Sequence, residues 1–156
     1  MTVFRLPRMS KNEIKDLISE QFLCRIAFVG ERYPHIAPFQ YVLLNGALYF
    51  HFTDYGRKMK LLKSGKRVCV EIEKYESDMS EFKFVTLKGR LKIVTDPMER
   101  EDAINKMTEH GRRMLSKNFL AAHGLKKEDD WSSFNFEKPL IIVKLNSEEE
   151  SGLKSP

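Results

Sequence analysis

The 156-residue sequence has two cysteines, one tryptophan and no long uninterrupted apolar run. A helix that crosses a bilayer needs about 20 consecutive apolar residues, and no stretch comes near that length. The N-terminal segment MTVFRLPRMSKNE also lacks the continuous apolar core of a signal peptide. We therefore expect a cytoplasmic protein that makes no use of a membrane.

Cysteine and histidine are too sparse to suggest a disulfide framework or a metal site. Cys24 and Cys69 lie in apolar segments, CRIAFV and RVCVEI, where a thiol behaves as a small buried hydrophobe. The separations of the histidines match no short metal motif. We expect both thiols to be reduced and buried, and no bound metal.

Several catalytic motifs are also missing. The sequence contains no nucleophile elbow, no P-loop and no GxGxxG fingerprint, which excludes the acyl-transfer and kinase classes that depend on them. The formal charge of +5 is compatible with nucleic acid, an anionic cofactor or a lysine-rich surface. Because basic residues alternate with acidic ones and form no basic arm, nucleic acid is the least favoured of the three.

The apolar pattern predicts about six strands in mostly antiparallel order. The strand-like runs are CRIAFVG, PHIAPFQYVLL, GALYFHFT, KRVCVEIE, FKFVTLKGRLKIV and PLIIVKL. Asn45-Gly46 between the second and third runs is a strong hairpin signal, and Gly89 marks a bulge or a close approach of backbones.

Three helices are expected between these strands. Ser10 and Glu13 form a capping box before an amphipathic helix over residues 10–22. Asp54 can cap a short helix that ends at Gly65, and Asp96-Pro97 begins a third helix. The expected fold is mainly β with inserted helices: a six-stranded antiparallel Greek-key split barrel in one domain over residues 1–156.

The stretch YFHFTDYGRK raises a question of electrostatics. Arg57 and Lys58 are expected in the first turn of a helix, where unpaired backbone N–H groups already carry partial positive charge. The preceding strand alternates, so Phe50 and Phe52 face the core while His51 and Thr53 face the other side. These donors and cations indicate an anion, most simply a phosphate monoester. The alternative is that both cations are ordinary solvated surface charges.

Pro38 interrupts the strand-like run HIAPFQYVLL and removes one backbone donor. One interpretation is a plain edge strand. The other is that the backbone of Ala37, Pro38 and Phe39 is released from pairing and faces a flat ligand, with Phe39 and Tyr41 as a wall.

Taken together, these segments resemble the FMN-binding split-barrel family related to pyridoxamine 5′-phosphate oxidase, in its nitroimidazole-reductase-like branch. The most specific segment is LYFHFTDYGRKMKLLKSGKRVCVEIE, supported by YPHIAPFQYV and the tail LNSEEESGLK. The resemblance implies a homodimer with FMN at the subunit interface, ahead of a deazaflavin or haem. The tail NSEEESGLKSP lacks the arginine-rich segment of the true oxidases, so vitamin B6 oxidation is not expected.

The resemblance also assigns cofactor-binding residues. Arg57 and Lys58 would bind the phosphate, the strand end would lie around the ribityl phosphate or ring edge, and the Pro38 segment would lie against the isoalloxazine. The full set is Ala37, Pro38, Phe39, His51, Phe52, Thr53, Arg57 and Lys58.

No catalytic residue, substrate or electron donor is identified by the sequence. The expected activity is that of an FMN-dependent oxidoreductase acting on an unidentified small molecule. One alternative is a flavin or haem carrier without turnover. Another is a basic β-barrel module that stacks nucleic acid on Phe50, Phe52 and Tyr55. Trp131 has three interpretations: an interface aromatic, a lid over the partner's flavin, or packing under a loop.

Overall fold

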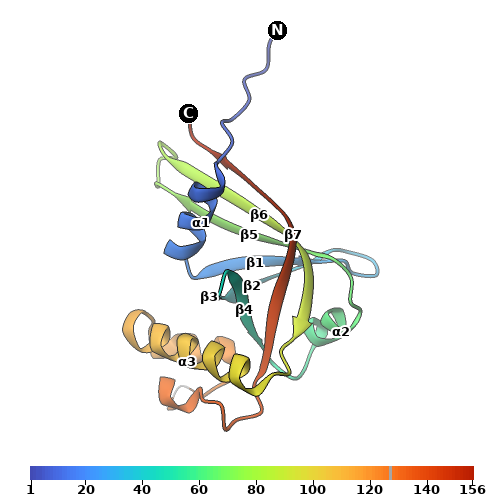
Figure 1. The fold of residues 1–156 in the computed structure, drawn as a ribbon, viewed down its shortest axis with the longest axis vertical. Coiled ribbons are helices and arrows are strands. Elements are labelled where there is room, and N and C mark those ends of the chain that lie inside the picture. The colour runs from blue at the N-terminus through green and yellow to red at the C-terminus, as the bar shows by residue number, and fades with distance from the viewer. Residues whose placement is uncertain (127) are drawn as a thin grey trace. The chain divides into compact units, whose positions relative to one another are not determined.

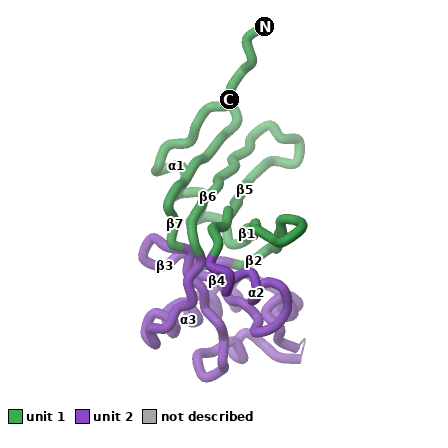
Figure 2. The backbone as a smooth tube through the Cα atoms, turned by 90° about the vertical axis from the view of Figure 1, so that its right-hand side faces the viewer, with its two compact units in different colours: residues 1–40, 66–90, 146–156 green, residues 41–65, 91–145 purple. Residues whose placement is uncertain are grey.

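The computed structural model describes residues 1–126 and 128–156 (Figure 1). The chain divides into two compact units, which Figure 2 shows in different colours. Unit 1 contains Met1–Gln40, Lys66–Arg90 and Asn146–Pro156, and unit 2 contains Tyr41–Gly65 and Leu91–Leu145.

Seven strands, three α-helices and two 3-10 helices make up the described chain. Their order is α1 (Lys11–Glu20), β1 (Leu23–Phe28), β2 (His35–Gln40), β3 (Val42–Leu44), β4 (Ala47–Phe52), α2 (Arg57–Lys63), β5 (Val68–Tyr75), β6 (Phe82–Ile93), α3 (Pro97–Met114), η1 (Lys117–His123), η2 (Trp131–Ser133) and β7 (Ile141–Lys154). Within the described residues, no helix combines the length and the apolar character that crossing a membrane requires.

In unit 1 the strands follow the order β2-β1-β5-β6-β7. Pairing is antiparallel from β2 to β1, from β1 to β5 and from β5 to β6. Alternate residues of β5 are buried, so Val68, Val70 and Ile72 face the core as the sequence predicts. Gly89 of β6 is a close-approach point, because a Cβ there would lie 2.0 Å from the carbonyl oxygen of Asn146.

Helix α1 covers the inner face of unit 1 with Ile14, Leu17 and Ile18. Its predicted capping box is confirmed: the Ser10 hydroxyl accepts from the Glu13 N–H, and the Glu13 carboxylate accepts from the Ser10 N–H. The helix ends at Glu20 rather than at residue 22, since the backbone becomes extended at Gln21.

In unit 2 the order is β6-β7-β4-β3. β3 and β4 form the predicted hairpin, in which Asn45 and Gly46 both have positive φ, 50° and 80°. Helix α3 begins as predicted, with the Asp96 carboxylate accepting from the Glu99 N–H and proline at the first helical position.

The core of unit 2 lies between α3, the two 3-10 helices and strands β4 and β7, whose chain segments Figure 1 shows beside one another. Its fully buried members include Ile104, Met107, Leu120 and Phe134. Met114, the last residue of α3, is 63% exposed, because the helix stops there and the chain becomes extended at Leu115.

The structure corrects the predicted number of strands from six to seven. The run HIAPFQYVLL is two strands, β2 and β3, separated at Tyr41. The break has a clear cause: the chain pairs with β1 up to Gln40 and then with β4 from Val42 onward. A single apolar run does not reveal a change of pairing partner.

The prediction that both cysteines are buried is wrong for one of them. Cys24 is buried, but Cys69 is exposed. The same alternation that buries Val68 and Val70 turns the residue between them to the opposite, outer face of the sheet.

Candidate functional site

The turn between β4 and α2 contains most of the predicted cofactor-binding residues. β4 ends at Phe52, Thr53 is half-buried, and α2 begins at Arg57. The prediction that Asp54 caps this helix is wrong: Gly56 is the N-cap, and no side chain caps the helix. Gly56 has a φ of 86°, a conformation that suits glycine, and this sharp turn moves the helix start beyond the reach of Asp54.

Arg57 and Lys58 are therefore the first and second helical residues, in the first turn as predicted but earlier in it than a cap at Asp54 would place them. Arg57 is exposed and Lys58 is half-buried. No acidic residue lies in the first turn, and Lys60 and Lys63 follow in the last turn, so the whole helix is cationic. With only seven residues, α2 has a short row of aligned peptides, so the two side chains supply most of the charge that an anion would meet.

His51 lies deeper than the sequence suggests. It is 8% exposed, and Tyr49 on the same face of β4 is 2% exposed. The expectation that only the face of Phe50 and Phe52 is core is therefore wrong, because both faces of β4 are buried. The opposite face is covered by η1 and the residues after η2, which bring His123 and Phe134 to His51.

The two histidines form a buried pair. Nδ1 of His51 and Nδ1 of His123 are 3.1 Å apart, so one ring donates a hydrogen bond and the other accepts it. Burial lowers the pKa of His51 to about 3, with smaller effects from the charges of His123 and Lys58. Burial likewise lowers the pKa of His123 to about 4. Both rings are therefore neutral near pH 7.

His123 was not among the predicted site residues, and its sequence context, AAHGL, gives no signal of this pairing. Around it lie the rings of Phe119, Trp131 and Phe134, at centroid distances of 5.7, 5.7 and 5.0 Å. The end of η1 also reaches Thr53: a Cβ at Gly124 would lie 3.3 Å from the Thr53 methyl group. Segments far apart in the sequence thus surround the end of β4.

Trp131 is 3% exposed and packs against the helix backbone at Gly111, where a Cβ would lie 2.3 Å from the indole ring. In this chain it is a core residue of unit 2, in agreement with the packing interpretation. Its Nε1 is buried and has no hydrogen-bond partner among the described residues.

The remaining predicted residues, Ala37, Pro38 and Phe39, lie in β2 of unit 1. In the part of the chain that the structure describes, β2 is an edge strand paired with β1 alone, as the plain interpretation of Pro38 requires. Ala37 and Phe39 are each 6% exposed and face the core, where Phe39 packs near Phe28 with ring centroids 6.5 Å apart. Pro38 is exposed on the outer face.

A further polar cluster escaped the sequence analysis. The Tyr49 hydroxyl donates to the Glu99 carboxylate at 2.6 Å, and Lys144 Nζ lies 3.4 Å from the same oxygen. Burial raises the pKa of Tyr49, with a further contribution from its bond to Glu99. Alternation on β4 could have paired Tyr49 with β7, but only the fold brings α3 and Glu99 to them. Among the described residues, no group of three or more His, Cys, Asp or Glu side chains could hold a metal ion.

Comparison with known proteins supports the expected fold. The family described as pyridoxamine 5′-phosphate oxidase matches residues 10–125. No curated protein matches the sequence.

Three solved structures illustrate the likeness. An FAD-binding protein from Mesorhizobium loti is 17% identical, with a TM-score of 0.71 over 98% of this chain and 100% of its own. A candidate 5-nitroimidazole antibiotic resistance protein from Bacteroides thetaiotaomicron is 15% identical, with a TM-score of 0.63 over 99% and 94%. The haem storage protein of Vibrio cholerae is 16% identical, with a TM-score of 0.64 over 92% and 94%. At these identities the likeness is one of fold, mainly β with inserted helices.

Proposed function

Because the chain belongs to the pyridoxamine 5′-phosphate oxidase family, we propose that it is a homodimeric flavoprotein that binds FMN and acts as an oxidoreductase on a small molecule. The observation that carries the proposal is the extent of the family match. Residues 10–125 include both β2 and the turn from β4 to α2, and so all eight predicted cofactor-binding residues.

The residues at the start of α2 fit a phosphate. Arg57 and Lys58 place two cations beside backbone N–H groups that no side chain caps. A phosphate monoester could accept hydrogen bonds from both side chains and from the helix end. His51 is buried at the strand end and neutral near pH 7, so the cations carry the electrostatic part of the binding.

The edge strand β2 would supply the contact with the ring system. Within the described residues its second edge has no strand partner, and Pro38 presents no N–H there. Backbone groups alternate sides along a strand, so the Pro38 carbonyl lies on that edge and can accept from a flat heterocycle, while the groups of Ala37 and Phe39 point toward β1. Bound flavin supplies the electron transfer, and these residues of the chain bind and orient it.

The homodimer is proposed on the outer face of the unit 1 sheet. Strand register places Tyr75, Phe82 and Phe84 on this face, with the rings of Phe82 and Phe84 stacked at 5.3 Å. Ile36 on β2 belongs to the same face and is 63% exposed. Sedimentation should give a dimer, and Ile36→Arg combined with Phe84→Arg should give a monomer that binds FMN more weakly.

Colour and mass test the cofactor directly. Purified protein should absorb as a flavin does, and denaturation should release a ligand whose mass identifies it. FMN supports the proposal, whereas FAD, a deazaflavin or haem would each replace that cofactor assignment. Reoxidation of the reduced protein by added electron acceptors then separates an enzyme from a carrier.

Binding of FMN to the apoprotein tests the phosphate residues. Two charge-assisted hydrogen bonds are each worth about 1.5–3 kcal/mol, so the double variant Arg57→Ala, Lys58→Ala should weaken binding by about 100-fold or more. Lys63→Ala, at the other end of α2, is the matched control and should leave affinity nearly unchanged. Equal affinity in the double variant and the wild type would rule out this phosphate site.

The alternative of a nucleic-acid-binding module requires exposed aromatic rings, and two of its three candidate rings are buried. Phe50 and Phe52 are 0% and 1% exposed, so neither can stack on a base, and only Tyr55 of the three aromatics is exposed.

A further inference from the structure

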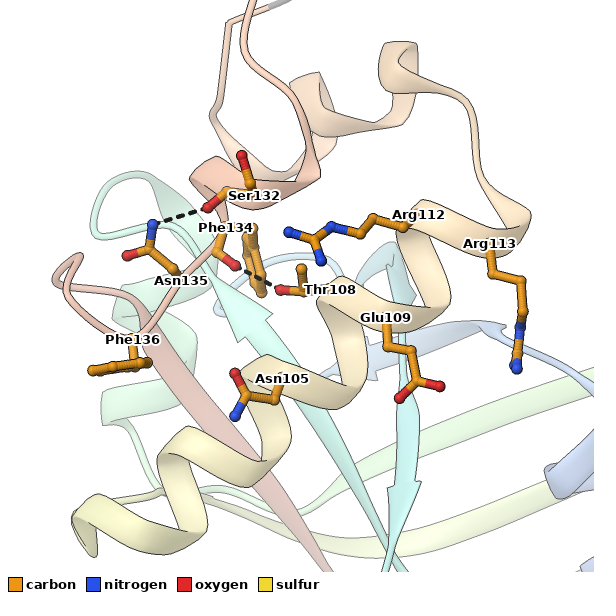
Figure 3. Close-up of a pocket in the computed structure, with 9 residues that line it drawn as sticks. All are labelled: Asn105, Thr108, Glu109, Arg112, Arg113, Ser132, Phe134, Asn135 and Phe136. Atoms are coloured by element: carbon orange, nitrogen blue, oxygen red, sulfur yellow. Dashed lines mark hydrogen bonds between the residues drawn. The ribbon is translucent and has the colours of Figure 1, made fainter.

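Unit 2 carries an open groove of about 560 Å³ that lies between α3 and the chain around η2 (Figure 3). One wall is α3 from Asn105 to Arg113, and the other is the segment from Ser132 to Phe136. The volume is in the range of small-molecule sites. None of the eight predicted cofactor-binding residues lines the groove, so it is a separate feature from the proposed flavin site.

The second wall is held rigidly against the first. The Thr108 hydroxyl bonds to the Phe134 carbonyl at 2.6 Å, and the Asn135 amide donates to the Ser132 carbonyl at 2.9 Å. The Asn135 side-chain oxygen also accepts from the Glu137 N–H. A ligand would therefore meet preformed walls and would not have to order the segment on binding.

Three charged side chains line the groove: Arg112, Arg113 and Glu109. Cations in the last turn of α3 are favoured by the helix dipole, which accounts for the charge of both Arg112 and Arg113 but not for their directions. Figure 3 shows the Arg112 side chain extending toward Thr108 and Ser132, across the space between the walls. The Arg113 side chain extends in the same direction as Glu109 in this view, and both also line the groove.

The guanidinium of Arg112 keeps donors for a ligand. Hydrogen bonds from Ser132 lower the pKa of Asp130, and the charges of Lys117 and then Arg112 lower it further through space. The Asp130 oxygen is engaged by the Ser132 N–H at 2.7 Å. Among the described residues, no hydrogen bond to Arg112 is found, and a guanidinium offers five N–H donors.

The other end of the groove is apolar and amide-lined. Phe136 is 47% exposed, a large fraction for an aromatic ring, and Asn105 lies nearby on α3 in the view of Figure 3. Asn105 precedes Arg112 by two helical turns, or about 10 Å along the axis. The lining of the groove thus includes a planar cation and an exposed aromatic ring.

We propose that this groove binds a small planar organic anion, with its carboxylate on Arg112 and its ring against Phe136. A guanidinium matches a carboxylate in two parallel hydrogen bonds, which favours this head group over a spherical anion. The Phe136 ring gains by offset or edge-on contact with a second ring. The Asn105 and Asn135 amides add polar contacts that select for ring substituents.

Benzoate is a suitable probe, with benzamide and acetate as its matched controls. Benzamide keeps the ring without the charge, and acetate keeps the charge without the ring. In amide-resolved NMR titrations, benzoate should shift the resonances of Arg112 and Ser132–Phe136 with a Kd of about 1 mM, as expected for a ligand of this size. Benzamide and acetate should each bind at least about fivefold more weakly.

Two exposed cations provide a matched pair of variants. Arg112→Ala should weaken benzoate binding by about tenfold, the loss of one charge-assisted contact. Lys88→Ala removes the same charge from a position of unit 1 that does not line the groove, and it should change the Kd less than twofold. Phe136→Ala should weaken benzoate but leave acetate unchanged. Both cations are exposed, so unchanged amide spectra will confirm that the variants are folded.

Three results would overturn the proposal: no saturable shift at tens of millimolar benzoate, equal losses in Arg112→Ala and Lys88→Ala, or equal binding of benzoate and acetate. Each can be read without flavin, so failure here leaves the proposed cofactor untouched.

Discussion

The two units bury their sheets in different ways. In unit 1, β5 alternates between buried and exposed residues, and its outer face remains open in the described chain. In unit 2, five consecutive residues of β4, Leu48–Phe52, are all buried. The difference arises because unit 2 adds α3, η1 and η2 to the second face of its sheet. A strand of alternating pattern is thus half-exposed in one unit and fully enclosed in the other.

This comparison bears directly on the candidate site. A histidine on an outer strand face would be an accessible ligand, whereas His51 on the enclosed face of β4 becomes half of a neutral, buried pair. The cations that follow it, Arg57 and Lys58, lie beyond the end of the strand and keep greater access to solvent. His51 and the two cations are close in sequence, but their electrostatic environments differ sharply.

The largest expected effects come from two glycines, one in each unit. Gly89→Ala sets a methyl group 2.0 Å from a backbone oxygen, and Gly111→Ala sets one 2.3 Å from the Trp131 ring. Overpacking typically costs about 1–3 kcal/mol, and we expect Gly89→Ala at about 3 kcal/mol or more, since backbone yields less than a ring. Chemical denaturation measures both free energies of unfolding.

The controls for these glycines are Lys88→Ala and Arg113→Ala, exposed neighbours that should change stability by less than about 0.5 kcal/mol. Helix propensity alone would make Gly111→Ala stabilising by about 1 kcal/mol. A stabilised variant would therefore show that Trp131 does not pack on Gly111.

The second largest effect is expected in unit 2, which should lose stability in acid. The folded pKa values of His51 and His123, about 3 and about 4, lie below the usual value of 6.5. The unfolded chain thus binds protons first, so this stability is complete above pH 6.5 and is lost as the pH falls through the folded values. For His123 the loss is on the order of 3 kcal/mol.

Unfolding free energies measured from pH 7 to pH 4 test this effect. His123→Phe should reduce the pH dependence over that range, since one titrating ring is removed. Phe119→Leu alters the same aromatic surroundings without a titrating group, so it should lower stability at every pH by a similar amount. The same pH dependence in His123→Phe and wild type would contradict the assignment.

Substitutions of the helix N-caps should have intermediate effects on stability, and they compare the starts of the helices in the two units. Ser10→Ala in unit 1 and Asp96→Ala in unit 2 each remove a side chain that accepts a backbone N–H, and each should cost about 1 kcal/mol. Asp54→Ala should cost less than about 0.5 kcal/mol, because Asp54 caps nothing. An equal loss at Asp54 would restore it as the cap of α2.

The smallest effect is expected at the outer face of unit 1. Arg25 Nη1 bonds to Glu73 at 2.7 Å and to Glu71 at 3.3 Å, with the arginine side chain 51% exposed. Exposed ion pairs contribute less than about 1 kcal/mol and weaken in salt. In the monomeric background of Ile36→Arg and Phe84→Arg, where no partner covers this face, Arg25→Met should therefore lower stability only slightly, and the difference should shrink at high salt. The same loss at low and high salt would contradict an exposed ion pair.

Local patterns identified much of the fold. The capping box at Ser10, the proline start of α3 and the Asn45-Gly46 turn were all predicted from a few neighbouring residues. Such features depend on interactions within four residues, so they are legible in the sequence. The split at Tyr41 and the start of α2 were missed, because a partner change and a glycine turn depend on the surrounding backbone.

The sequence by itself determined the local features of the chain: the alternating strands, the capped helices and the cationic turn at Arg57 and Lys58. Only the tertiary structure decided that His123 faces His51, that Glu99 reaches Tyr49, and that Arg112 spans a groove toward Ser132. The physical reason is the separation in sequence over which each kind of interaction acts. Hydrogen bonds and rotamers within a turn are set by near neighbours, whereas burial and pKa depend on whatever distant segment excludes water.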